Sequence, residues 1–144
     1  YSDEAAAREW YTAETDKDLY EKAVKASFLN MGIYGATYAI TDATAYLTLN
    51  PYNAAASFEA KMNQIHTQIY VALFVDEQEI YANWRRTGYP VLTPVNFPGN
   101  VTNGTIPRRI KYSTSEYSVN STNLAEAVKH QGEDSFTTKI WWDK

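Results

Sequence analysis

The stretch TDKDLYEKAVKASFLNMG, residues 15–32, decides the fold class of this chain. Its apolar and small side chains recur at three- and four-residue steps, so they share one face of a helix. The members of this face are Leu19, Tyr20, Ala23, Val24, Ser27, Phe28 and Met31. Thr15 and Asp18 resemble a capping box, and Gly32 stands where a C-terminal cap is expected. The sequence therefore predicts a helix from Thr15 to Met31.

Two further helices are predicted downstream. Between residues 57 and 74 the apolar side chains again follow helical spacing. They are Phe58, Met62, Ile65, Ile69, Ala72 and Leu73. Asp76 with Glu79 gives a second capping-box signal, which opens another helix that closes near Gly88.

A short helix is also expected at the start of the chain. Residues 2–10 resemble the later part of a helix, which would form an antiparallel pair with the next helix around Trp10 and Tyr11. Because the chain opens on Tyr1 without an initiator methionine, we expect a fragment or a processed product. The helical segments together predict a mainly α fold of helical pairs, with little β structure.

Long irregular, aromatic-rich loops separate these helices. The helical pattern is lost over residues 33–56, which carry four tyrosines and almost no charge. Residues 89–144 are rich in Pro, Gly and Asn, and they predict one short helix from about Leu124 to His130. Thr137 to Trp142 is expected to form a terminal strand or an extended tail. We therefore divide the single domain, residues 1–144, into a helical region over 1–88 and a loop region over 89–144.

The composition excludes several classes of function. The 17 acidic side chains outnumber the 13 basic ones, so the chain has no basic field that could bind a nucleic acid backbone. No apolar run approaches the roughly 20 residues of a membrane helix. The absence of cysteine removes disulfides and thiolate chemistry. Tyr and Trp are abundant, and they suit cores, wet interfaces and the apolar faces of sugar rings.

No catalytic or metal-binding pattern is found. His66 and His130 lie far apart, and a lone helical histidine is usually a surface or core residue. Several acidic residues could in principle pair as a glycosidase acid and nucleophile, but nothing indicates that any two face each other across a cleft. They are Glu14, Asp16, Glu77, Glu79, Glu133 and Asp134. We therefore expect that the protein is not an enzyme and that it binds neither a cofactor nor a metal.

Two arginine pairs beside aromatic residues form the strongest local signal. They occur in NWRRTGYP, residues 83–90, and in IPRRIKY, residues 106–112. Cation–π stacking and the fixed donors of the guanidinium groups could hold a long loop against a helical body. We interpret the motif as structural rather than as a ligand contact. Its members are Trp84, Arg85, Arg86, Arg108 and Arg109.

At these residues the chain resembles the SusD/RagB outer-membrane lipoproteins, in particular the C-terminal portion of the SusD-like subgroup. The resemblance runs in order through several pieces. They are DLYEKAVKAS at 18–27, QIYVALF at 68–74, WRRTGYP at 84–90, IPRRI at 106–110, Tyr112, Glu116, Asn120, Asn123 and KIWWD at 139–143. It implies a helical fold whose N-terminal part contains TPR-like scaffolding. We expect this chain to lack that part, including the signal peptide and the lipid-bearing cysteine.

The resemblance also implies a function. Such a lipoprotein, at the outer-membrane surface of Bacteroidetes-like bacteria, captures an oligosaccharide and passes it to a SusC-like TonB-dependent transporter without breaking a bond. Sugar capture needs aromatic platforms and a few polar groups, which are densest in the loop over residues 33–56. From composition and loop position alone we expect contacts from Tyr38, Tyr46, Tyr52 and Asn53. The alternatives are a protein-interaction or scaffold module and, third, a glycoside hydrolase.

Overall fold

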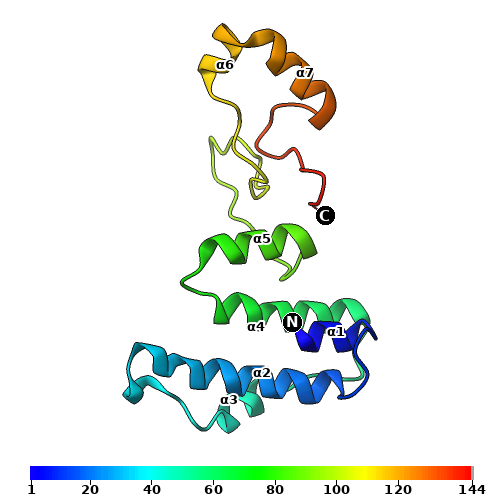
Figure 1. Ribbon diagram of the computed structural model, residues 1–144, viewed down its shortest axis with the longest axis vertical. Coiled ribbons are helices and arrows are strands. Elements are labelled where there is room, and N and C mark those ends of the chain that lie inside the picture. The colour runs from blue at the N-terminus through cyan, green and yellow to red at the C-terminus, as the bar shows by residue number, and fades with distance from the viewer. Residues whose placement is uncertain (144) are drawn as a thin grey trace. The chain divides into compact units, whose positions relative to one another are not determined.

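The computed structural model describes residues 1–143, and its regular elements within that range are all helical (Figure 1). The mainly α fold is therefore confirmed. The elements are α1 (Ser2–Ala7), α2 (Asp16–Asn30), η1 (Met31–Tyr34), η2 (Ala36–Tyr38), α3 (Thr44–Leu49), α4 (Phe58–Ala72), α5 (Glu77–Thr87), α6 (Thr114–Val119) and α7 (Ser121–Gln131). No described helix is both long and apolar enough to cross a membrane.

The chain forms two compact units, one over Tyr1–Tyr81 and the other from Ala82 onward. We call them the first unit and the second unit. The first contains the helices up to α4, and the second contains α6 and α7, with the boundary inside α5.

Helix α2 begins as the sequence predicts but ends differently. The Thr15 hydroxyl accepts a hydrogen bond from the Asp18 N–H at 3.1 Å and donates to the Asp18 carboxylate at 2.7 Å, which confirms the capping box. The predicted cap at Gly32 is wrong, because the chain continues through it into η1. The turn comes at Gly35, whose φ of 141° is rarely adopted by other residues. Gly32 instead allows a close approach, since a Cβ there would lie 3.1 Å from that of Ala39.

The predicted positions of the two other long helices are confirmed. Helix α4 starts where the Ser57 hydroxyl accepts a hydrogen bond from the Ala60 N–H at 3.3 Å. Helix α5 starts where the Asp76 carboxylate accepts one from the Glu79 N–H at 3.1 Å, as the capping-box signal indicates. It ends directly before Gly88, which has a positive φ of 78°.

The core of the first unit joins α2 and α4 to the loop between them. Its buried members are Tyr20, Val24, Ala43, Tyr52 and Ile65, and Phe28, Tyr46, Leu47 and Ile69 pack against them. Helix α1 packs on α2, as expected, and also on α4. The expectation that Trp10 lies within the α1–α2 pair is wrong. The helix stops at Ala7 because Glu9 turns to a left-handed φ of 60°, and Trp10 then lies 76% exposed.

The second unit contains more helix and less extended chain than the sequence predicts. Helix α6 precedes α7, so this region has two helices rather than one. Of the two alternatives expected for Thr137–Trp142, a terminal strand or an extended tail, the strand is wrong, since no described residue forms a strand with which it could pair. The segment is held locally instead, where the Thr138 hydroxyl donates to the carbonyl of Glu133 at 2.6 Å.

The buried carboxylate of Asp134 ties the second unit together. It accepts hydrogen bonds from the guanidinium of Arg109 at 2.7 Å, the hydroxyl of Tyr117 at 2.5 Å and the backbone N–H of Tyr112 at 3.2 Å. Burial alone would raise the pKa of Asp134, but these three donors outweigh it and hold the pKa below its ordinary value of 3.8. The ionised carboxylate therefore stabilises the folded state.

This network predicts acid sensitivity of the second unit. Because the folded pKa is lowered, the stabilisation is complete above pH 3.8 and is lost as the pH falls through the folded pKa. We expect Asp134→Asn to lower the urea midpoint of the second unit at pH 7, and this difference from the wild type to shrink at a pH well below 3.8. The measurement is amide exchange in α7 against urea at both pH values. An equal difference at both values would contradict the assignment.

Candidate functional site

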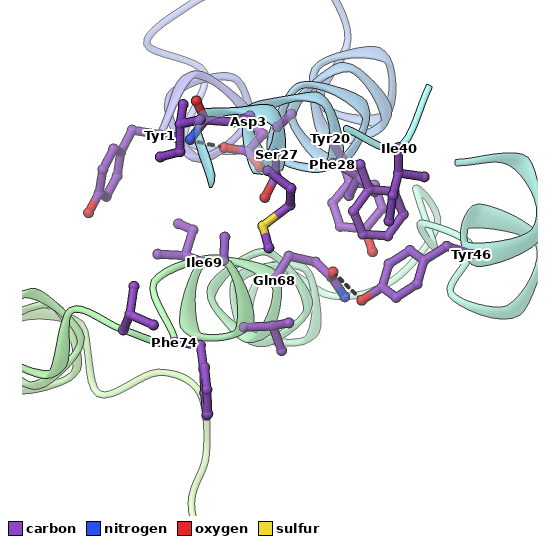
Figure 2. Close-up of a pocket in the computed structure, with 18 of the residues that line it drawn as sticks. Tyr1, Asp3, Tyr20, Ser27, Phe28, Ile40, Tyr46, Gln68, Ile69 and Phe74 are labelled. Carbon is purple, nitrogen blue, oxygen red and sulfur yellow. Dashed lines mark hydrogen bonds and ion pairs between the residues drawn. The ribbon is translucent and has the colours of Figure 1, made fainter. Parts of the chain in front are cut away.

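A hollow of functional interest lies in the first unit, between α2 and α4 (Figure 2). It has a volume of about 480 Å³ and an apolar lining. Phe28 of α2 and Ile69 of α4 lie on its two sides, while Tyr34, Ile40 and Tyr46 reach it from the segment after α2. We call this hollow the apolar groove.

Tyr46, a predicted ligand contact, lies in the wall of the apolar groove. Its ring packs edge-on against that of Phe28, with centroids 4.9 Å apart, and its hydroxyl donates to the Gln68 side chain at 2.7 Å. The same hydrogen bond is visible in Figure 2. Tyr46 thus connects α3 to both helices, and its hydroxyl is already occupied within the protein.

Tyr52 is buried in the core and does not line the groove. Its ring lies 5.0 Å from that of Tyr20, and its hydroxyl donates to the Asp16 carboxylate at 2.9 Å. Lys61 also donates to this carboxylate, at 2.8 Å. Burial, followed by the bond to Asp16, raises the pKa of Tyr52. The ring and the hydroxyl are therefore both engaged within the protein.

Tyr38 and Asn53, the other two predicted contacts, remain accessible. Tyr38 closes η2 and is 61% exposed. Asn53 is exposed, its side-chain oxygen accepts a hydrogen bond from the Ala55 N–H at 3.1 Å, and its own N–H donates to Gln64. Of the four predicted contacts only Tyr46 lines the groove, so the structure does not gather them in one cavity.

A second candidate site is an exposed aromatic platform at Trp10. The Arg8 guanidinium lies 5.2 Å from the Trp10 ring centroid and 5.4 Å from that of Phe58. Ala7 and Glu9 complete the lining of an open hollow of about 330 Å³ beside them. The Trp10 ring is therefore held in place while most of its surface stays free.

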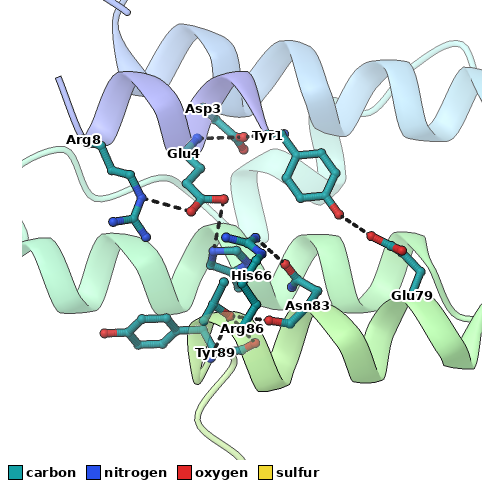
Figure 3. Close-up of polar contacts among 10 residues, drawn as sticks. Tyr1, Asp3, Glu4, Arg8, His66, Glu79, Asn83, Arg86 and Tyr89 are labelled. Carbon is teal, nitrogen blue, oxygen red and sulfur yellow. Dashed lines mark hydrogen bonds and ion pairs between the residues drawn. The ribbon is translucent and has the colours of Figure 1, made fainter. Parts of the chain in front are cut away.

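Glu4, which itself lies close to His66, holds the Arg8 side chain in place. Its Nε donates to the Glu4 carboxylate at 3.0 Å, and the other oxygen of that carboxylate lies 3.5 Å from Nε2 of the buried His66 (Figure 3). The backbone N–H of Trp10 also donates to the carbonyl of Ala5 at 2.9 Å. Sequence reasoning missed this platform because it depends on the left-handed turn at Glu9, which a glutamate does not signal.

The histidines lie in separate surroundings. His66 is buried in α4 near Glu4, and His130 is exposed on α7 near Glu126. Among residues 1–143, no three His, Cys, Asp or Glu side chains come together as a metal site would require.

The two arginine pairs contact aromatic rings and backbone within the second unit. Arg108 lies 3.9 Å over the buried Trp84 ring, and Arg85 lies 4.5 Å over Trp142. Arg85 also donates to the Arg108 carbonyl at 2.7 Å, and Arg86 donates to the side chain of Asn83 at 2.8 Å (Figure 3). Arg109 pairs with Asp134, as described above. That these contacts serve stability rather than ligand binding stays a prediction.

Comparison with known proteins gives one consistent family. The SusD-like model, described as Susd and RagB outer membrane lipoprotein, matches residues 2–143. A solved chitin-binding protein is 34% identical, with a TM-score of 0.77, and a chitin-binding SusD homolog from Flavobacterium johnsoniae is 36% identical, with a TM-score of 0.70. A SusD-like protein of Bacteroidetes AC2a is 31% identical, with a TM-score of 0.82. No curated protein matches.

These matches include nearly all of this chain but only part of each relative. They cover 99% of the chain and 31%, 34% and 28% of the three solved chains, in the order given above. The chain thus spans about a third of the length of its solved relatives. From the extent of the family match and these identities we conclude that the chain belongs to the SusD/RagB family of outer membrane lipoproteins.

Proposed function

We propose that this chain contributes to oligosaccharide capture at the bacterial outer-membrane surface, with delivery to a SusC-like TonB-dependent transporter and without bond cleavage. The observation that carries the proposal is the identity of 34% and 36% with two chitin-binding proteins over 99% of the chain. The ligand class that follows is a chain of β-linked N-acetylglucosamine. Its rings have apolar faces and carry hydroxyl and acetamido groups at their edges.

Exposed aromatic side chains support this ligand class. An apolar sugar face stacks on a flat ring that is accessible and already ordered, because little conformational entropy is then lost on binding. Trp10 meets both conditions through Arg8 and the backbone bond to Ala5, and Tyr38 offers a second exposed ring. We assign the contacts to Trp10, Tyr38 and Asn53. Tyr46 and Tyr52 act indirectly, by anchoring the loop that carries Tyr38.

The surroundings of the carboxylates support binding without catalysis. A glycosidase needs two carboxyl groups that face each other across a cleft with different proton affinities. Asp16 and Asp134 instead lie among cationic and hydroxyl donors, which hold the pKa of each below its ordinary value against the effect of burial. Glu14 pairs with Lys22. Carboxylates in such settings are suited to structural roles.

Loss of a stacking ring should weaken glycan binding and leave the fold intact. We expect Trp10→Ala and Tyr38→Ala each to raise the Kd for chitohexaose by about 2- to 13-fold, which corresponds to roughly 0.5 to 1.5 kcal/mol. The measurement is titration calorimetry on the protein in the full form that its gene encodes, with melting temperatures as a check on folding. Tyr70→Ala, a partly exposed ring on α4, is the matched control.

Two results would contradict the proposal at different levels. If chitohexaose and related oligosaccharides give no heat with the wild type, the chain does not serve glycan binding. If the wild type binds but both variants bind equally well, the glycan site lies elsewhere.

A further inference from the structure

The apolar groove leaves an unusual amount of hydrophobic surface uncovered. Ile33 and Phe74 at its edge are 69% and 78% exposed, and Met31, Tyr34 and Val75 are also exposed. They come from two segments, η1 and the residues that follow α4, and all of them line the same hollow. A contiguous apolar patch of this kind marks an interaction surface.

The chemistry of the groove does not suit a sugar. Each pyranose ring carries several hydroxyl or acetamido groups, and burying them without hydrogen bonds is costly. The Tyr46 hydroxyl, which faces the groove, is already bonded to Gln68. Among the exposed side chains of the lining, Met31, Ile33, Phe74 and Val75 offer no hydrogen-bonding group, and Tyr34 carries one hydroxyl. The occupant that this surface favours is itself apolar.

The length of the relatives indicates where this occupant comes from. The match covers 99% of this chain but only 28–34% of each of the three solved proteins, so each has about twice as much further chain. The groove lies between α2 and α4, and two neighbouring helices present ridges and grooves into which the side chains of a third helix can pack. A helix with one apolar face would cover Ile33 and Phe74 together.

We propose that the apolar groove is the docking surface for an amphipathic helix from the part of the SusD-like fold that this chain does not span. Phe28, Met31, Ile33 and Phe74 are its anchors. The inference rests on family membership and on the groove, and it is independent of the glycan proposal. It assigns to protein packing a cavity that would otherwise be taken as the ligand site.

Cysteine labelling tests the proposal, because the chain has no cysteine of its own. Ile33→Cys and Phe74→Cys are compared in two proteins. One is the 144-residue chain alone, and the other is a chimera in which this chain replaces the matched third of the Flavobacterium johnsoniae homolog. We expect maleimide to modify both positions at least about ten-fold more slowly in the chimera. Ile110→Cys, 86% exposed in the second unit, is the control for overall reactivity.

Each possible result of the labelling supports or excludes one occupant of the apolar groove. Equal labelling in both proteins overturns the proposal. Protection in the 144-residue chain by chitohexaose makes the groove a glycan site, and protection that grows with protein concentration assigns it to a second copy. If the chimera does not fold, overlapping 20-residue peptides from the unmatched part of the homolog are tested for displacement of bis-ANS from the 144-residue chain. Displacement by none of them also overturns the proposal.

Discussion

Trp84→Ala is expected to lower the free energy of unfolding of the second unit by about 3 to 5 kcal/mol. The ring is buried, and it carries the Arg108 guanidinium at 3.9 Å. Arg108 in turn pairs with the Asp143 carboxylate at 2.5 Å, while its carbonyl accepts the bond from Arg85. Removing the ring leaves a cavity and takes away the surface that orients these partners. The measurement is amide exchange in α7 as a function of urea.

The control for this prediction is Trp141→Ala. Trp141 is 95% exposed in the same unit, and its loss should change stability by no more than about 0.5 kcal/mol. Trp84→Phe, which keeps an aromatic surface under Arg108, should cost less than Trp84→Ala. If Trp84→Ala unfolds like the wild type but no longer binds chitohexaose, the arginine motif is a ligand contact and the structural interpretation fails.

The helices could be predicted from the sequence because their signals are local. The periodicity of α2 and α4 and the caps at Thr15 and Asp76 involve residues no more than four positions apart. Helix α6 also has a local signal. Ser113 and Glu116 fit the capping-box spacing, and the Ser113 hydroxyl accepts a hydrogen bond from the N–H of Ser115, the second residue of α6, at 3.4 Å.

The loop over residues 33–56 could not be predicted in the same way. The burial of Tyr52 depends on Tyr20 and Asp16, which lie more than 30 positions earlier in the chain, and no short pattern encodes such a contact. The four tyrosines of this loop have no helical spacing, so the sequence alone does not show which of their rings are buried and which are exposed. The structure divides them by their partners, since Tyr46 and Tyr52 are hydrogen-bonded to side chains on α4 and α2, while Tyr38 stays exposed.

The Trp10 platform shows a second limit of local patterns. Residues 2–10 resemble the later part of a helix, and this resemblance places the Trp10 ring in a helix pair. The left-handed turn at Glu9 is favoured by tertiary contacts of its neighbours, with Arg8 held between Glu4 and two aromatic rings. Such a turn follows from the fold and not from the residue that adopts it.

Tyr20→Ala is expected to destabilise the first unit by about 3 to 5 kcal/mol. Tyr20 is fully buried in α2, its ring packs against Tyr52, and its hydroxyl donates to the Asn50 carbonyl at 3.2 Å. It therefore links α2 to the end of α3, in addition to the contact between Phe28 and Tyr46. Amide exchange in α3 and α4 against urea measures the loss, and α3 should lose protection first because one of its attachments is removed.

Tyr20→Phe separates the two contributions of this residue. It keeps the buried ring and removes only the hydroxyl, so it should cost about 0.5 to 1.5 kcal/mol, the usual net contribution of one hydrogen bond. Tyr11→Ala, at an exposed ring, serves as the control and should change stability little. If Tyr20→Ala costs no more than Tyr20→Phe, the ring is not a core element of the first unit. The loop that carries Tyr38 would then depend on its other anchors, Tyr46 and Tyr52.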